Sequence, residues 1–121
     1  MGNTTSHPVV HFEVLGRDAS ALRAFYSEAF GWPVGPADDG PMEYSMVHIR
    51  DAGGIDGGIG KAPDGAGHIT FYVGVDDPQA ALAQVERLGG RTIQPPVTIP
   101  GGVTFALFAD PEGHVVGLLK E

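Results

Sequence analysis

The stretch HFEVLGRD at residues 11–18 returns as TFYVGVDD at residues 70–77, and this internal repeat decides the fold. Sliding the chain against itself by 59 positions, without a gap, aligns 51 pairs of residues, of which twelve are identical. Chance at this composition would give roughly four. Two copies of one structural unit are therefore expected, a first module over about residues 9–61 and a second over about residues 68–120.

Each copy reads as one long strand, one helix and then three shorter strands. The long strands VVHFEVLG (9–16) and HITFYVGV (68–75) are rich in β-branched and aromatic residues. Asp18 and Asp77 follow where a helix N-cap belongs, because a carboxylate there accepts backbone N–H groups that have no helical partner. The shorter strands are expected near residues 32–35, 42–50, 55–61, 91–94, 103–109 and 114–120. The predicted fold class is α+β, with two tandem βαβββ modules that form a curved mixed sheet, or cup, and carry their helices on its outer face.

Composition and charge restrict the partners and the compartment. The formal net charge is −8 and the seven Lys and Arg residues do not cluster, so nucleic acid is not an expected partner. No stretch approaches the roughly 20 apolar residues that span a bilayer, and MGNTTSHPVV at residues 1–10 lacks the features of a signal peptide. With no cysteine in its 121 residues, the chain suits a reducing compartment. One cytoplasmic domain without a membrane partner is therefore expected.

Three stretches carry a family resemblance. HFEVLGRDASALRAFYSEAFGW at residues 11–32 resembles the opening of a vicinal-oxygen-chelate module, and GGRTIQPP at 89–96 and FADPEGHVVGLLK at 108–120 are similar to the close of the second module. The resemblance covers about residues 9–120 and implies that residues 1–121 form a single glyoxalase/bleomycin-resistance-like domain. This superfamily includes metal-dependent isomerases and lyases, ring-cleaving dioxygenases, fosfomycin-modifying transferases and drug-sequestering proteins without a metal. The resemblance therefore implies a fold more than a reaction.

Members of this superfamily that use a metal place one ligand on the first strand and one on the last strand of each module. On this chain, the resemblance assigns those positions to His11, Gly58, Thr70 and Gly117. Glycine offers no side-chain donor, and neutral threonine is a poor ligand for divalent ions. The usual metal quartet is therefore not expected, and no cofactor is predicted. The alternative is a divalent metal held by a different set of side chains: His11, Glu13, Asp56 and His68.

Alternation along the strands predicts which side chains line the cup, because residues two apart share a face. The predicted ligand-binding residues are His11, Glu13, Tyr44, Asp56, Gly58, His68, Thr70, Tyr72 and Gly117. Glu13 and His11 are the candidate catalytic residues, since a carboxylate in a partly apolar cup can act as a general base. His11 is also consistent with a lining residue that only hydrogen-bonds to a neighbour. The glycines either leave room for a ligand close to the backbone or let the sheet curve.

The opposite strand faces and the helices should supply the core. The strand residues expected to point toward the helices and to be buried are Phe12, Val14, Phe71 and Val73. Trp32 is expected to cover the core, whereas Tyr44 is a candidate for stacking on a planar ligand.

The predicted function is that of a small-molecule-binding protein of the glyoxalase/bleomycin-resistance type without the usual metal. Its ligand would be partly aromatic or carbonyl-bearing, and any catalysis would be acid–base chemistry by Glu13 and His11. The alternative is a metal-dependent lyase, isomerase or dioxygenase of the same superfamily, so the sequence leaves open whether the protein is an enzyme. A homodimer is expected, because long sheet edges need covering by a neighbour.

Overall fold

The computed structural model describes residues 6–121, which divide into two compact units. The first unit comprises residues 11–70, and the second comprises the chain up to Val10 together with residues 71–121. The division follows the two copies of the repeat. Within the described residues, no helix combines the length and the apolarity needed to cross a membrane.

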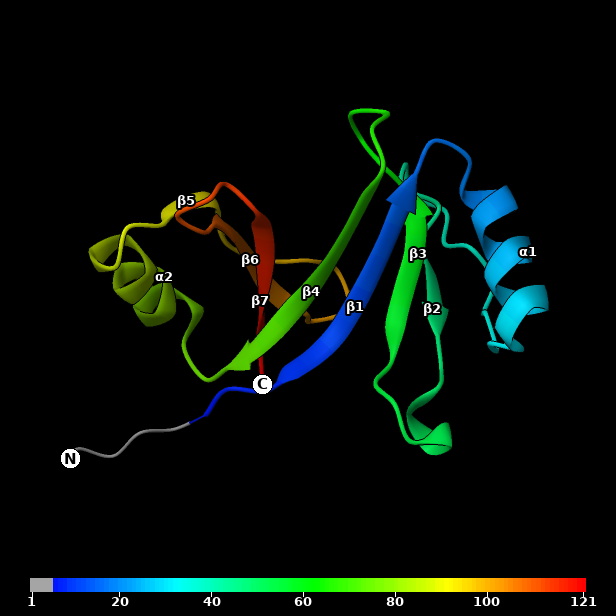
Figure 1. The fold of residues 1–121 in the computed structure, drawn as a ribbon, viewed down its shortest axis with the longest axis horizontal. Helices are drawn as coiled ribbons and strands as arrows, with labels where there is room; N and C mark the ends of the chain where they lie inside the picture. Colours follow the sequence, from blue (N-terminus) through cyan, green and yellow to red (C-terminus); the bar gives the residue numbers. More distant parts are fainter. Residues whose placement is uncertain (1–5) are drawn as a thin grey trace. The chain divides into compact units, whose positions relative to one another are not determined.

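The first unit is a three-stranded mixed sheet with one helix beside it (Figure 1). Its elements are β1 (Val9–Gly16), α1 (Ala19–Phe30), β2 (Ser45–Val47), the short 3-10 helix η1 (Arg50–Ala52) and β3 (Gly57–Lys61). The strand order is β2-β3-β1, with β3 parallel to β1 and antiparallel to β2.

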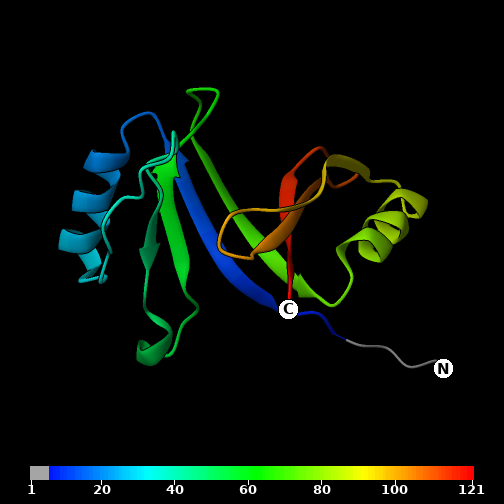
Figure 2. The ribbon, with the colours of Figure 1, turned by 180° about the vertical axis from the view of Figure 1, so that it is seen from behind.

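The second unit has four strands in the order β4-β7-β6-β5. Its elements are β4 (His68–Val75), α2 (Pro78–Arg87), β5 (Arg91–Thr98), β6 (Thr104–Ala109) and β7 (Val115–Lys120). β4 and β7 run parallel, and the β7–β6 and β6–β5 pairs are antiparallel. α2 packs on β5, β6 and β7 (Figure 2). The predicted α+β class is confirmed.

The repeat is kept in the pairing of the strands. Glu13 on β1 lies opposite Gly58 on β3, and 59 residues later Tyr72 on β4 lies opposite Gly117 on β7. Both helices begin with the predicted cap: the carboxylate of Asp18 accepts the N–H of Ala21 at 3.0 Å, and Asp77 accepts two N–H groups of α2. The gapless repeat in the sequence therefore corresponds to a structural repeat.

The first module departs from the predicted βαβββ pattern. The strand expected at residues 32–35 is reduced to one bridge, Val34 to Val47, and the strand expected at 42–50 spans only Ser45–Val47. Pro33 and Pro36 have no N–H for a ladder. In addition, the carboxylate of Asp38 accepts backbone N–H groups of this segment, so the chain turns here. The second module has all five elements.

The core follows the predicted alternation with one exception. In the first unit, Val14 packs with Val47 and Ile59, and Phe12 and Trp32 cover this cluster. In the second unit, the core residues are Val75, Leu82, Ala106 and Leu118, against which Val73 packs. Phe71 was expected to be buried but is 44% exposed. It precedes Tyr72, where the pairing of β4 with β7 begins, so it lies outside the region that α2 covers.

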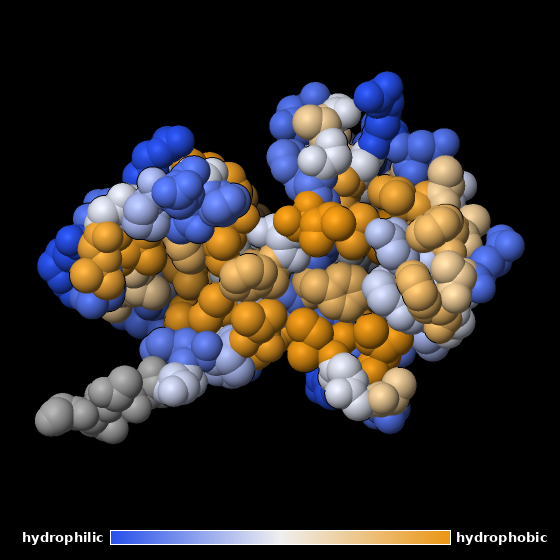
Figure 3. Space-filling model, viewed as in Figure 1, coloured by the Kyte–Doolittle hydropathy of each residue, from blue (hydrophilic) through white to orange (hydrophobic). Residues whose placement is uncertain are grey.

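Apolar side chains also reach the surface, as the hydrophobic areas in Figure 3 show. On α1, Phe25 and Phe30 are 60% and 64% exposed. They flank Tyr26, whose ring stacks on Trp32 with the centroids 5.1 Å apart. This aromatic cluster lies on the helix side of the first sheet, because Trp32 also contacts Phe12.

Candidate functional site

A chain of three polar side chains lies on the sheet face opposite α1. The Tyr44 hydroxyl donates to Oε2 of Glu13 at 2.9 Å, and Nε2 of His11 lies 2.9 Å from the same hydroxyl. Glu13 is only 9% exposed, and His11 and Tyr44 are half-buried. The structure therefore brings together three of the predicted site residues in one hydrogen-bonded chain.

The donor and the acceptor in each hydrogen bond of this chain follow from the hydrogens available. A phenol carries one proton, and here that proton points to Glu13. His11 satisfies the phenol oxygen when Nε2 carries a hydrogen and donates it. Burial lowers the pKa of His11, and the negative charge of Asp56 opposes this only in part. His11 is accordingly neutral at pH 7.

Glycines beneath Tyr44 make room for its ring. Gly58 pairs with Glu13 across β1 and β3, and a Cβ added at Gly58 would lie under 3.0 Å from the Tyr44 ring and hydroxyl. A Cβ at Gly60 would lie 3.0 Å from Cδ1 of Tyr44. The sequence predicted that these glycines either leave room for a ligand or curve the sheet. In the structure, the space is taken by a tyrosine of the protein itself.

The second unit repeats this arrangement with a different tyrosine. Tyr72 lies opposite Gly117, and a Cβ at Gly117 would overlap the Tyr72 ring. Tyr72 is 8% exposed, and its ring meets that of Phe105 edge-on, with the centroids 6.5 Å apart. Both predicted glycine positions on the last strands are thus covered by aromatic rings.

Asp56 immediately precedes β3, level with His11 in the β1–β3 pairing, and its carboxylate serves a loop. Its carboxylate accepts the N–H groups of Ile49 at 3.0 Å and Arg50 at 2.9 Å, and it pairs with the Arg50 guanidinium at 3.2 Å. The Arg50 N–H is the main cause that lowers the pKa of Asp56. His68 pairs with Asp64 at 3.3 Å.

Thr70 lies half-buried on β4. His11, Glu13 and Tyr44 form a site over Gly58, whereas Asp56 and His68 stabilise loops.

The donor set of this site does not fit a metal ion. Over residues 6–121, no three His, Asp or Glu side chains form a group that could hold one. The four residues of the alternative ligand set, His11, Glu13, Asp56 and His68, are therefore not assembled. The physical reason is that Asp56 is saturated by two backbone N–H groups and a guanidinium, while His68 is turned toward Asp64.

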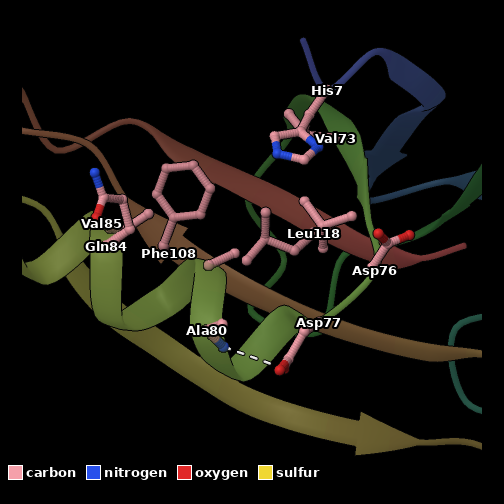
Figure 4. A pocket seen from close by; sticks show the side chains of 11 residues that line it. His7, Val73, Asp76, Asp77, Ala80, Gln84, Val85, Phe108 and Leu118 are labelled. Atoms are coloured by element: carbon pink, nitrogen blue, oxygen red, sulfur yellow. Dashed lines mark hydrogen bonds between the residues drawn. The ribbon is translucent and has the colours of Figure 1, made fainter. Parts of the chain in front are cut away.

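A hollow of about 500 Å³ lies in the second unit between α2 and the strands β4, β6 and β7 (Figure 4). Val73, Phe108 and Leu118 form its apolar wall, and His7 and Asp76 lie at its edge. No sequence pattern predicted this hollow. The available signal was the small size of Ala80 and Ala81 on the helix face that meets the sheet.

Comparison with known proteins places this geometry in a family. A family model described as a glyoxalase-like domain matches residues 11–119. CFP32 of Mycobacterium tuberculosis, a protein named for a proposed glyoxylase activity, is 32% identical over 108 residues, which cover 84% of this chain and 41% of that protein. The chain thus spans about two fifths of the length of that relative. A glyoxylase-like domain-containing protein of Didymella fabae is 27% identical, with 84% of each chain covered.

Solved structures agree on the fold. A hypothetical protein of Bacillus halodurans C-125 has a TM-score of 0.76 at 15% identity, covering 97% of this chain and 96% of that one. A methylmalonyl-CoA epimerase in complex with methylmalonyl-CoA and NH4+ has a TM-score of 0.73 at 18% identity, with the same coverage. A member of the glyoxalase/bleomycin resistance protein/dioxygenase superfamily from Vibrio splendidus 12B01 has a TM-score of 0.67 at 14% identity, covering 96% and 100%. The chain therefore belongs to the glyoxalase-like domain family.

Proposed function

We propose that this domain binds a small, partly aromatic or carbonyl-bearing molecule at the chain formed by His11, Tyr44 and Glu13. The observation that carries the proposal is a buried carboxylate on a sheet face, joined through a phenol to a neutral imidazole. Burying such groups costs free energy unless they are hydrogen-bonded, and an apolar set would stabilise the sheet more simply. Polar groups held in this way are typical of a surface that recognises a ligand.

The same groups can move a proton on the bound molecule. Glu13 accepts a proton as a carboxylate, and the neutral imidazole of His11 is a second proton-accepting group. The proposal is therefore a metal-independent binding protein whose chemistry, where a substrate has an acidic C–H or O–H, is acid–base. A solved relative in fold contains methylmalonyl-CoA, a carbonyl-bearing molecule, which supports this ligand class.

The remaining parts of the proposal concern the assembly and the compartment. The chain would act as one cytoplasmic domain in a homodimer. In the second unit β5 is an outer strand that a second copy can cover, although its Pro95 and Pro96 cannot donate to a ladder. Light scattering at micromolar concentration tests the dimer, and a monomer would contradict it.

The binding test uses protein dialysed against a chelator and labelled with nitrogen-15. Acetophenone, benzoate and 4-hydroxyacetophenone are titrated separately, and amide shifts are followed. We expect the shifts to concentrate at Glu13, Gly58 and Gly60, and His11→Ala and Glu13→Gln to weaken affinity by about 1 kcal/mol each, as for a lost hydrogen bond. The control His68→Ala, which changes a loop pair, should leave affinity unchanged. Unchanged affinity together with a large loss of melting temperature in both site variants would show that these residues are structural.

A further inference from the structure

We propose that Tyr44 is an internal stand-in for the ligand, and that the site takes a hydroxyaromatic molecule. The ring of the ligand would replace the Tyr44 ring over Gly58, and its hydroxyl would take the place of the Tyr44 hydroxyl between His11 and Glu13. This inference rests on the proposed function and names the ligand class of the same site.

The site around Tyr44 is built for a phenol. One acceptor, Oε2 of Glu13, and one imidazole nitrogen, Nε2 of His11, each lie 2.9 Å from the hydroxyl. The floor is a run of buried backbone at Gly57–Gly60, where Gly58 and Gly60 leave a flat surface under the ring. An aliphatic alcohol would satisfy the two polar groups but would leave this floor uncovered. A flat ring with one hydroxyl covers the glycine floor and also pairs with both polar groups.

The polar partners stay in place when the ring leaves. His11 and Glu13 belong to β1, whose pairing with β3 runs from Phe12 to Gly16. Tyr44 belongs instead to the turn segment before β2, where Glu43 has the left-handed φ of 48°. Asp38 holds the backbone of Tyr44 through two hydrogen bonds. The Asp38 carboxylate accepts the Tyr44 N–H at 3.2 Å, and the Asp38 backbone N–H donates to the Tyr44 carbonyl at 2.9 Å. Entry of the ligand ring requires the half-buried Tyr44 side chain to turn away from Gly58 about its own bonds while its backbone stays in place.

Exchange of one phenol for another leaves the number of hydrogen bonds unchanged. A ligand therefore gains affinity only from what it covers beyond the area of one tyrosine ring, such as a second fused ring. The intact Tyr44 also competes, because apparent affinity falls with the fraction of molecules in which the site is open. Removing the competing hydroxyl should consequently tighten binding, which is the opposite of what a direct contact to the ligand would do.

The test uses 2-naphthol, with naphthalene as the analogue that lacks the hydroxyl, and dissociation constants from calorimetry. We expect Tyr44→Phe to bind 2-naphthol about fivefold to tenfold more tightly than the unchanged protein, because one set of competing hydrogen bonds is gone. Tyr44→Ala should bind it still more tightly, and naphthalene should bind about tenfold more weakly than 2-naphthol in each variant. The matched control is Tyr26→Phe, since Tyr26 packs on Trp32 at the helix side and should not affect binding.

The outcomes separate this inference from the proposed function. Weaker binding of 2-naphthol by Tyr44→Phe would overturn the inference, because Tyr44 would then contact the ligand, while the binding site itself would stand. Binding of acetophenone or benzoate without binding of 2-naphthol in any variant would overturn the ligand class alone. Absence of shifts at Glu13 and Gly58 with every probe would overturn both. Because Tyr44→Phe keeps the ring in place, it remains informative if Tyr44→Ala does not fold.

Discussion

Adding one methyl group at Gly58 should destabilise the domain through Tyr44. The Cβ of Gly58→Ala would lie under 3.0 Å from the ring and hydroxyl of Tyr44, which form the far end of a side chain that can move away. The ring must then leave the floor and give up its two hydrogen bonds, at about 1 kcal/mol each. Partial exposure of the ring adds about 1 kcal/mol. The total is about 3 kcal/mol.

The assay is thermal unfolding followed by circular dichroism. For a domain of this length, a loss of about 3 kcal/mol corresponds to a drop of roughly 10 °C in melting temperature. The control is Gly67→Ala, where the added Cβ meets only the carbonyl oxygen of Leu15, at 3.7 Å. This variant should change the melting temperature by no more than about 2 °C.

A double-mutant cycle shows whether the effect passes through Tyr44. In the Tyr44→Ala background the ring is absent, so Gly58→Ala should cost almost nothing further. The coupling between the two substitutions should therefore be about 3 kcal/mol in the favourable direction, as expected for residues in direct contact. Additive losses, with coupling below about 0.5 kcal/mol, would refute the reasoning and mean that Gly58 is needed for the backbone itself.

Three further changes test other parts of the structure by thermal unfolding. Ser45 is fully buried, and its hydroxyl has no hydrogen-bond partner among the described residues. Ser45→Ala should therefore raise the free energy of unfolding by about 1 kcal/mol, whereas the control Ser20→Ala, at an exposed position, should not. A loss of stability in Ser45→Ala would mean that the hydroxyl has a hydrogen-bond partner. Gly117→Ala should lower the melting temperature because its Cβ overlaps the buried Tyr72 ring, and a neutral result would place that ring elsewhere. The Arg50 N–H lowers the folded pKa of Asp56 below 3.8, so its contribution to stability is present above that pH and is lost as the pH falls through the folded pKa. The stability difference between the unchanged protein and Asp56→Asn should accordingly shrink between about pH 5 and pH 2, and a constant difference would contradict this.

Much of the fold could be predicted because the repeat carries local signals. Asp18 and Asp77 occur where a cap is needed, and the alternation of apolar residues along β1 correctly assigns Phe12 and Val14 to the helix side. Predictions were wrong where tertiary pairing decides. Phe71 fits the alternation but lies before the start of the β4–β7 ladder, and the sequence has no signal for where that ladder begins.

The site could be predicted only in part. Alternation places His11 and Glu13 on one face, since both belong to one strand. It cannot show that Tyr44 bridges them, because the path from Pro33 to Tyr44 depends on side-chain contacts of Asp38 rather than on any period. The role of Asp56 could not be predicted either, because its carboxylate accepts the backbone N–H of Arg50 in a turn.

The two modules cover the same position by different routes, which indicates what the glycines are for. In the second module the covering ring comes from Tyr72, which lies directly across the ladder from Gly117. In the first module the residue across from Gly58 is Glu13, and the ring comes from Tyr44 in the turn segment. A glycine needed only to curve the sheet would not require a ring above it in both modules. Position 13 of the first module matches position 72 of the second, and it holds a carboxylate where the second module holds a tyrosine. The first module therefore has a hydrogen-bond acceptor beside the covering phenol, and the second module has none at that position. The repeat therefore explains the shared floor, and the single difference between Glu13 and Tyr72 explains why we propose that the ligand binds in the first module.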